Sequence, residues 1–469
     1  MKRFSSLIFS VLIFSLANAQ TAKPLSPVAI DKIVKKLMDT AEVSGLALAV
    51  IQDNKISYVK SYGYKNKAKN EWNDTATCFY AASLAKPLFA YIVMQMVDQK
   101  LIDLDKPLYT YLPKPIPEYS NYKDLAGDER WKLITARHCL DHTTGFPNWR
   151  QFNPRDNKKL EIFFTPGTRY AYSGEGLFLL QMVMETITHK GLEELAKEGI
   201  FRPFGMYRTS FLWQPAFETN YALGHDVNED TMPKDKRTKA NAAGSMETTI
   251  ADYARFVSAV MNGKGLSANA WKEMFTPQIA IHSKRQFPSL DTTTTKENDG
   301  LQLSYGLGWG LLNTTKGKAF FKEGHTDGWG HYMISFPEKR SGIILMSNSS
   351  SGESIYPELV KELTSVTIPA VWELYTPYTP TVSLPLKSLE ELTGNYTGKF
   401  NAKIELINGR LKVSSEMAGL PPTNLYAKDA SNLFMKTMDL QIKVNRNAAG
   451  KIDKLLVTDD GEHFDLVKQ

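Results

Sequence analysis

The chain has 469 residues, with 56 lysines and arginines against 50 aspartates and glutamates, and a formal net charge of +6. That length exceeds one ordinary domain, and so small and dispersed a charge excess does not indicate a nucleic-acid partner. Two cysteines, Cys78 and Cys139, are too few for a disulfide scaffold and are expected to be buried free thiols.

The first 19 residues have the pattern of a signal peptide. Lys2 and Arg3 precede a short apolar stretch over 7–17, and Ala17-Asn18-Ala19 is a small-x-small cleavage site. The apolar stretch is too short to span a bilayer, and no later run in the sequence is typical of a transmembrane helix. We therefore expect an exported protein, periplasmic or secreted, without a stable membrane span.

Hydrophobic periodicity predicts the elements of a first domain over residues 24–370. A helix near 28–40 precedes strands at 46–51 and 55–62, which are joined at an Asp53-Asn54 turn. Further helices are expected from residue 83 onward and at 135–142, 174–189 and 249–261, and further strands at 320–323, 331–336 and 342–346. Strands at both ends with helices between them indicate an α+β fold, an antiparallel sheet flanked by helices with a helical subdomain.

The C-terminal part of the chain has a different pattern. Residues 371–386 are rich in proline and threonine and are expected to form a linker. Over 387–469, short alternating runs are separated by turn pairs such as Asn408-Gly409 and Asp460-Gly461. This spacing is typical of a small all-β barrel or sandwich, and it contains no chemical motif.

A hydroxyl and an amine lie three residues apart in the segment Ser83-Leu84-Ala85-Lys86-Pro87, at the start of a nearly all-apolar run. Proline is tolerated only in the first turn of a helix, so the helix begins near Ser83, and residues three apart on it share a face. Burial and the N-terminal end of the helix dipole both lower the pKa of Lys86. The amine can then take the proton of the serine and make it a nucleophile.

Two other Ser-x-x-Lys matches occur, Ser57 with Lys60 and Ser120 with Lys123. The first falls in an expected strand, where side chains alternate between faces, and the second falls in a proline-rich loop. Neither position brings the two groups together.

Tyr172 is the second candidate catalytic residue. It directly precedes Ser173, which is expected to cap the helix beginning at Gly174, and such a boundary can direct a side chain into a cleft. A phenol titrates near pH 10, and a neighbouring ammonium such as Lys86 would favour its ionised form, a usable base. A packed aromatic ring at a helix start is the structural alternative.

Glycines cluster around a strand start in Gly324-His325-Thr326-Asp327-Gly328-Trp329-Gly330-His331. They allow the backbone to approach a ligand closely, and an N–H from this segment could join that of Ser83 in stabilising an oxyanion. A tight hairpin with a surface histidine would give the same pattern.

With these motifs in this order, the chain resembles the serine β-lactamase and penicillin-binding-protein-like superfamily. The similarity is to its class C-like branch, which includes β-lactamases, esterases and D-amino-acid peptidases. It covers most of 28–369 and includes four further segments, at 101–107, 142–147, 305–309 and 342–347. The tail over 387–469 resembles the lipocalin-like β domain that often follows such cores.

The resemblance implies an acyl-enzyme mechanism that needs no cofactor and no metal. Ser83 would attack a carbonyl while Lys86 and Tyr172 shuttle the proton. The N–H groups of Ser83 and Gly328 would hold the oxyanion, and water would then hydrolyse the ester. His325 stands where the family has lysine or histidine, so its side chain is expected to contact the substrate.

Two positions depart from the family pattern. Gly174 stands where the second motif, Tyr-x-Asn, has an amide donor for the substrate carbonyl, and Asp327 stands where the third motif has glycine. An added carboxylate would repel an anionic substrate, so an ester or a peptide-like amide is expected before a penicillin. The expected substrate class is a small or peptide-like molecule, D-amino-acid and β-lactam-type compounds and cell-wall fragments included.

Three other functions compete with this one. An α/β-hydrolase would need a Gly-x-Ser-x-Gly elbow, which the sequence lacks. A zinc site could draw on one cluster of residues, namely His138, Cys139, Asp141 and His142. The main alternative is a non-catalytic penicillin-recognising or peptidoglycan-binding protein that keeps the fold, which the two departures favour and the retained serine, lysine and tyrosine oppose.

Overall fold

The computed structural model describes residues 25–376, 378–459 and 462–469. The expected signal peptide and the expected Asp460-Gly461 turn lie outside these residues. Within them the helices are α1 (Pro27–Ala41), α2 (Ala85–Asp98), α3 (Ala136–Leu140), α4 (Gly174–Thr188), α5 (Leu192–Ala196), α6 (Arg202–Phe204), α7 (Ile250–Met261), α8 (Ala268–Met274), α9 (Tyr356–Thr364) and α10 (Leu386–Leu392).

The larger sheet joins strands from both ends of the first domain, as the sequence predicts. Its spatial order is β3 (Glu71–Trp72), β2 (Lys55–Asn66), β1 (Gly45–Gln52), β11 (Ser341–Ser347), β10 (Trp329–Phe336), β9 (Gly317–Thr326), β8 (Gly310–Thr314), β7 (Ser304–Tyr305) and β6 (Ile279–Ala280). Neighbouring strands are antiparallel, with Leu46 of β1 opposite Ser347 of β11. A separate short pair, β4 (Phe79–Tyr80) with β5 (Glu247–Thr248), lies just before the turn that leads into α2.

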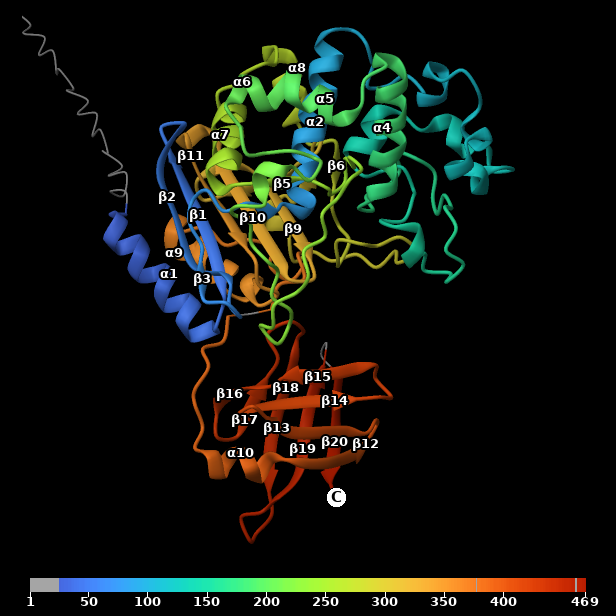
Figure 1. Ribbon diagram of the computed structural model, residues 1–469. Helices are drawn as coiled ribbons and strands as arrows, with labels where there is room; N and C mark the ends of the chain where they lie inside the picture. Colours follow the sequence, from blue (N-terminus) through green and yellow to red (C-terminus); the bar gives the residue numbers. More distant parts are fainter. Residues whose placement is uncertain (1–24, 377, 460–461) are drawn as a thin grey trace, which may run out of the picture.

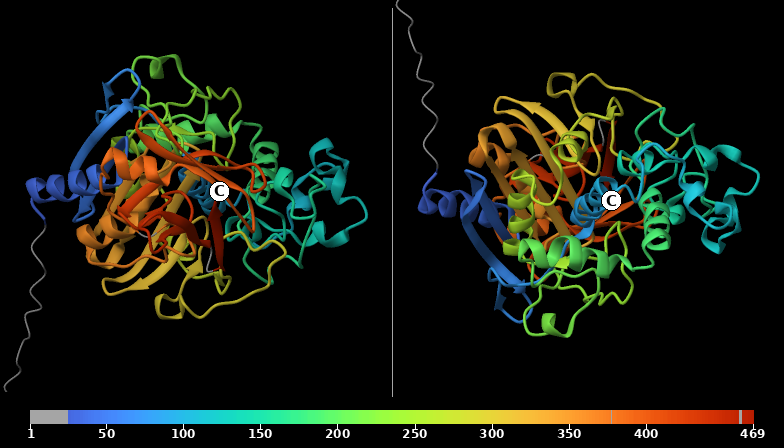
Figure 2. Two further views of the ribbon diagram at one scale, coloured as in Figure 1. Left: turned by 90° about the horizontal axis from the view of Figure 1, so that it is seen from below. Right: turned by 90° about the horizontal axis from the view of Figure 1, so that it is seen from above.

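Alternation along β1 separates two hydrophobic layers. Leu46 and Leu48 pack in one cluster with α1 and α9, whereas Ala47 and Ala49 pack in another with α2 and α7. Successive side chains of a strand point to opposite faces, so this apolar strand is buried on both sides. The sheet therefore lies between two helical layers, and the helical subdomain extends from the α2 face (Figures 1 and 2).

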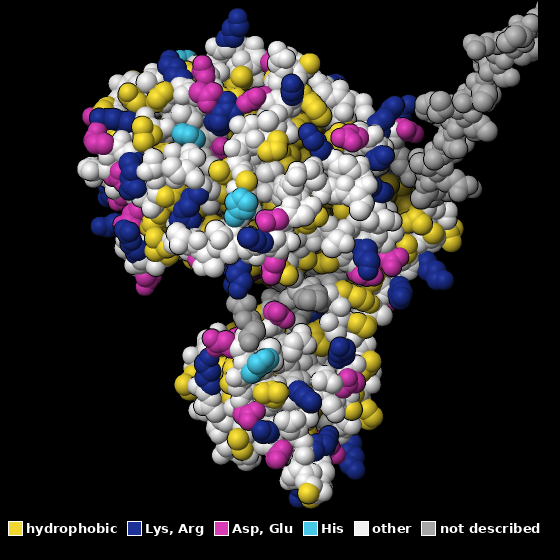
Figure 3. Space-filling model, turned by 180° about the vertical axis from the view of Figure 1, so that it is seen from behind, with side chains coloured by type: hydrophobic (Ala, Val, Ile, Leu, Met, Phe, Trp, Pro, Cys, Tyr) yellow, Lys and Arg dark blue, Asp and Glu magenta, His cyan; other side chains and the backbone are white. Residues whose placement is uncertain are grey.

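The tail forms a near-closed, barrel-like sheet of its own (Figure 1). Its spatial order is β15 (Leu420–Asn424), β14 (Arg410–Ser415), β13 (Ala402–Ile407), β12 (Gly394–Gly398), β20 (Glu462–Lys468), β19 (Ile452–Asp459), β18 (Leu440–Arg446), β17 (Asn432–Phe434) and β16 (Tyr426–Asp429). The expected α+β fold with a C-terminal all-β unit is confirmed. Figure 3 shows this unit as a separate lobe, with charges of both signs scattered over that face.

The segment expected as a linker begins inside the first domain. Trp372 and Tyr375 are buried in the cluster that includes α1 and α9. Thr376 then contacts the second unit, where it donates a hydrogen bond to the Lys436 carbonyl. In the described part of the chain, no helix is both long and apolar enough to cross a bilayer.

Candidate active site

Ser83 and Lys86 meet as their spacing predicts. A 3₁₀ turn, Ala82–Leu84, leads directly into α2, and Lys86 Nζ lies 2.8 Å from Ser83 Oγ. Lys86 also donates a hydrogen bond to the Ala243 carbonyl at 2.7 Å, which holds the amine in place. Ser83 is partly exposed, so a substrate can reach the hydroxyl.

The Ser57 match does not form such a pair. Ser57 donates its hydroxyl to the Val50 carbonyl, while Lys60 forms an ion pair with Asp31 at 2.6 Å. The side chains occupy opposite faces of β2, as expected for positions three apart on a strand.

Burial favours the neutral form of the Lys86 amine. Its side chain is only 1% exposed and makes no ion pair with any carboxylate in the described residues. Desolvation, with a further contribution from the nearby Lys322 ammonium, lowers its pKa well below the ordinary value for lysine. A neutral amine within hydrogen-bond reach of a serine hydroxyl can act as its base.

Tyr172 lies beside this pair. The centre of its ring is 5.0 Å from Lys86 Nζ and 4.9 Å from Lys322 Nζ, and its hydroxyl is buried without a hydrogen-bond partner among the described residues. Burial raises the pKa of the phenol well above 10, although the nearby Ser83 side chain opposes that rise. The expectation of an ionised phenol is therefore wrong, because burial and the nearby Glu323 charge both raise this pKa and so favour the neutral phenol.

Local contacts fix the orientation of Tyr172. Ser173 caps α4 as expected, since its hydroxyl accepts the Gly176 N–H at 3.1 Å. The His142 ring packs on the Tyr172 ring with centroids 4.2 Å apart, and His142 Nδ1 accepts the Ser173 N–H. His142, a member of the candidate zinc cluster, thus holds Tyr172 in position. Cys139 of that cluster is a buried free thiol, as is Cys78.

His325 and Gly328 lie in the tip of the β9–β10 hairpin. The His325 side chain is 64% exposed and places Nδ1 2.8 Å from Glu353 Oε2, so it faces this carboxylate. The Gly328 N–H donates to Ser350 Oγ at 2.8 Å, which leaves it unavailable to an oxyanion. The structure thus matches the hairpin with a surface histidine, and the oxyanion role expected for Gly328 needs another donor.

The residue that sequence reasoning missed is Lys322, three positions earlier. It is fully buried on β9, touches the face of Tyr172, and donates to the carbonyl and the carboxylate of Glu323. Lys322-Glu323-Gly324 fits the third motif, lysine followed two residues later by glycine, better than the segment at 325–328. With this register the glycine is present, and Asp327 lies in the exposed hairpin turn.

Gly324 allows β9 to approach the turn that holds Ser83. A Cβ atom there would lie 3.1 Å from the Ala81 carbonyl oxygen and 3.3 Å from the Leu84 nitrogen. Both neighbours are backbone atoms of the turn that holds Ser83, so a side chain at 324 would push β9 away from it. The β9 backbone therefore lies directly against the turn that holds Ser83.

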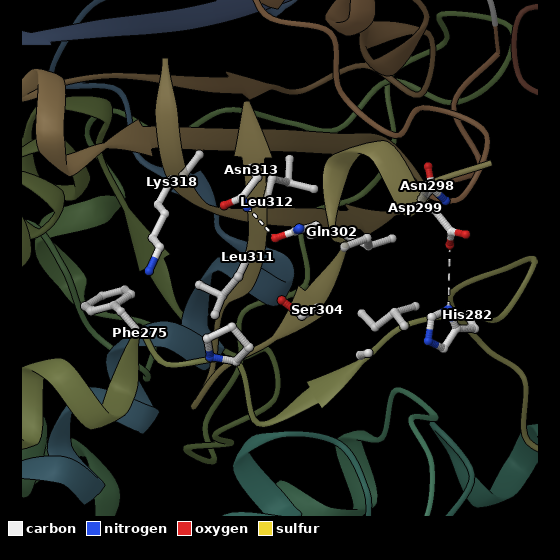
Figure 4. A pocket seen from close by; sticks show the side chains of 15 residues that line it. Phe275, His282, Asn298, Asp299, Gln302, Ser304, Leu311, Leu312, Asn313 and Lys318 are labelled. Carbon is white, nitrogen blue, oxygen red and sulfur yellow. Dashed lines mark hydrogen bonds and ion pairs between the residues drawn. The ribbon is translucent and has the colours of Figure 1, made fainter. Parts of the chain in front are cut away.

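A separate cavity lies outside the cluster formed by Ser83, Lys86, Tyr172 and Lys322. It has a volume of about 460 Å³ and opens at the β6–β8 edge of the larger sheet, between Phe275 and Lys318 at one end and the His282–Asp299 pair at the other (Figure 4). Its lining includes none of Ser83, Lys86, Tyr172 and Lys322.

The family model described as "Beta-lactamase" matches residues 30–361. The chain belongs to the β-lactamase family. Family membership, together with relatives named as hydrolases, supports serine hydrolase activity in general.

Several β-lactamase-family relatives extend over most of the chain. Penicillin-binding protein 4* of Bacillus subtilis (strain 168) is 21% identical, covering 93% of this chain and 97% of its own. The D-alanyl-D-alanine-carboxypeptidase/endopeptidase AmpH of Escherichia coli (strain K12) is 23% identical, covering 75% of this chain and 92% of its own. The solved octameric penicillin-binding protein homologue from Pyrococcus abyssi has a TM-score of 0.57 at 17% identity, covering 94% of this chain and 100% of its own. That similarity spans both structural units and shows the shared fold.

Proposed function

We propose that this protein is a serine hydrolase that forms an acyl-enzyme on Ser83 and cleaves an ester or a peptide-like amide. The observation that carries the proposal is the 2.8 Å contact between Ser83 Oγ and the Nζ of a buried Lys86, whose pKa burial lowers. A lysine with no catalytic or structural demand would rarely be buried without a carboxylate partner.

The proposed reaction follows from the protonation states. Ser83 Oγ forms a bond to the substrate carbonyl carbon while its proton passes to Lys86 Nζ. The Ser83 N–H and a backbone N–H of β9 beside Gly324 hold the oxyanion. The phenol of Tyr172, whose neutral form burial favours, passes its proton to the leaving group as the carbonyl–leaving-group bond breaks. Tyr172 then recovers a proton from the neighbouring Lys86 ammonium, which returns Lys86 to its neutral form. Water then repeats the sequence on the acyl-enzyme, and Lys86 again accepts the proton.

The assignment of Lys322 to the third motif removes one of the two departures that favour a non-catalytic binding protein. The sequence of the first 19 residues further leads us to propose that the enzyme acts outside the cytoplasm, on small or peptide-like substrates that include cell-wall fragments. The names of penicillin-binding protein 4* and AmpH support that substrate class.

Covalent labelling tests the proposal. We expect a fluorophosphonate or a fluorescent penicillin to label the protein on Ser83, and Ser83→Ala to abolish the label. Lys86→Ala should lower nitrophenyl acetate turnover by about a hundred- to ten-thousand-fold, and Tyr172→Phe should lower by a similar factor the turnover of an amide or alkyl ester, whose leaving group must be protonated. If neither probe forms an adduct and neither variant changes the rate, the non-catalytic alternative is correct.

A panel of nitrocefin, nitrophenyl esters and D-alanyl peptides would then identify the scissile bond. We expect turnover of the esters or the peptides to exceed that of nitrocefin.

A further inference from the structure

Trp149 occupies the space of the side chain that Gly174 lacks. A Cβ atom at 174 would lie 2.5 Å, 2.6 Å and 3.0 Å from three carbons of the Trp149 ring. The indole thus rests directly on the Gly174 backbone, and the second motif has glycine because no side chain fits beneath the ring. The amide side chain is absent at position 174 and the Trp149 ring takes its place.

The same ring reaches from α4 to the catalytic amine. Phe178 follows Gly174 by one helical turn and packs on Trp149 with ring centroids 5.5 Å apart, so the indole lies along this face of α4. Its ring centre is 5.7 Å from Lys86 Nζ, and the side chain is partly exposed. Trp149 therefore presents an aromatic surface beside the reacting atoms.

A second exposed ring lies next to Tyr172. Phe287 is 44% exposed and meets the Tyr172 ring edge-on, with centroids 5.5 Å apart. Its loop is held in place because the buried Gln286 donates to Glu323 Oε1 at 2.6 Å, and because Arg169 donates to three carbonyls of residues 288–291. Aromatic side chains thus flank the catalytic group on two sides.

We propose that Trp149 selects the acyl part of the substrate by stacking, and that the enzyme favours acyl groups with a flat aromatic side chain. This inference deepens the proposed function and rests on it. A peptide amide in the substrate would find no donor at 174, whereas an aromatic ring gains offset-stacked or edge-to-face contact with the indole.

Three nitrophenyl esters that share one leaving group test the inference: phenylacetate, cyclohexylacetate and acetate. The first two acyl groups are similar in size, and only the first is aromatic. We expect the wild-type kcat/KM to favour phenylacetate over cyclohexylacetate by about three- to tenfold, the usual advantage of an aromatic pair beyond its buried area. Trp149→Leu should bring that ratio close to one, and Trp149→Phe should keep most of it.

Gly174→Ala provides the matched control. As a single substitution, the added methyl group should displace the indole and reduce the preference for phenylacetate over cyclohexylacetate. Added to Trp149→Leu, it should change that ratio of kcat/KM values little. Circular dichroism and thermal unfolding verify that each variant is folded. If the folded Trp149→Leu protein keeps the full aromatic preference, the inference is wrong and the hydrolase stands. If the wild type hydrolyses no ester and forms no Ser83 adduct, both the proposed function and the role of Trp149 are overturned.

Discussion

Two buried lysines flank the Tyr172 ring, and their charges are coupled. Lys86 Nζ and Lys322 Nζ lie 5.0 Å and 4.9 Å from the ring centre. After burial, the Lys322 charge is the next largest cause that lowers the pKa of Lys86. Lys322 therefore does more than fill the third motif, because it helps to keep the base deprotonated.

Lys322→Met should shift the pH profile of the enzyme. The base works only when deprotonated, so activity is lost as pH falls through the Lys86 pKa. Removing the neighbouring positive charge raises that pKa, and we expect the acidic limb of kcat/KM to move to higher pH. Lys318→Met, an exposed lysine of the same strand, is the control and should leave the limb unchanged. An unmoved limb in a folded Lys322→Met protein would show that the two amines are not coupled.

At the scale of elements, one carboxylate fastens α1 to the sheet. Asp31 accepts hydrogen bonds from Tyr58 and Tyr62 and forms an ion pair with Lys60, all on β2. Lys60 is the largest of the causes that lower the pKa of Asp31 to about 2. The ionised side chain is thus the acceptor for three donors from one strand.

Asp31→Asn should destabilise the protein by about 1–3 kcal/mol, the usual effect of losing hydrogen bonds to a charged group. Because the pKa of Asp31 is lower in the folded than in the unfolded protein, its ionised form stabilises the fold. This contribution is full at pH values above 3.8, the ordinary pKa, and is lost as the pH falls toward 2. We therefore expect the difference in melting temperature from the wild type to be full at pH 6 and to shrink below pH 4. Asp39→Asn, at an exposed position of the same helix, should have little effect at either pH. A difference that is independent of pH would contradict the ion pair.

The β9–β10 hairpin has an ion pair with the opposite pH dependence. Glu353 raises the pKa of His325 to about 9, so the contribution to stability is full below the ordinary value of 6.5 and is lost as pH rises through 9. His325→Gln should lower stability at pH 6 by less than about 1 kcal/mol, because the histidine is exposed, and should have no effect at pH 10. Thermal unfolding at both pH values measures this. A raised KM with unchanged stability would instead support the sequence-based substrate role of His325.

At the scale of the whole molecule, a buried lysine joins the two units. Lys436 of the tail donates to the Ala41 carbonyl at the end of α1, and its Nζ lies 3.5 Å from the Tyr426 ring centre. Nearby, Arg410 forms an ion pair with Glu42 at 2.5 Å. The tail is therefore docked on the first domain by polar contacts that include one amine removed from water.

Burial lowers the pKa of Lys436 from 10.5 to about 7, so the unfolded state binds more protons between these values. Stability should rise as pH increases from 7 to 10, by at most about 1.4 kcal/mol for each pKa unit, and contact with the Tyr426 ring reduces the effect. Lys436→Met should remove this slope, and Lys443→Met, at an exposed position on β18, should keep it. Calorimetry at pH 7 and pH 10 measures the change in stability for each protein. If wild type and Lys436→Met show the same change between the two pH values, the expectation is wrong.

The sequence by itself determined what depends on local geometry. Alternation and turn chemistry predicted β1, β2 and the hairpin between them, and Pro87 fixed the start of α2. Ser83 and Lys86 could be paired because residues three apart on a helix always share a face. The same reasoning correctly set aside the pair on β2, because strand geometry separates positions three apart.

Only the tertiary structure decided what depends on contact between distant segments. The third motif was assigned three residues too late, since Lys322-Glu323-Gly324 and His325-Thr326-Asp327 each match part of the Lys/His-Thr-Gly pattern in one hairpin, and only packing shows that Lys322 faces Tyr172. The protonation state of Tyr172 followed from burial, which a sequence does not display. From the sequence, Gly174 only lacks the amide side chain of the second motif. The tertiary structure shows that the Trp149 ring occupies the space of that side chain. Sequence spacing determines which side chains share a face of one helix or strand. Only tertiary packing determines which faces contact one another and how far their side chains are buried from water.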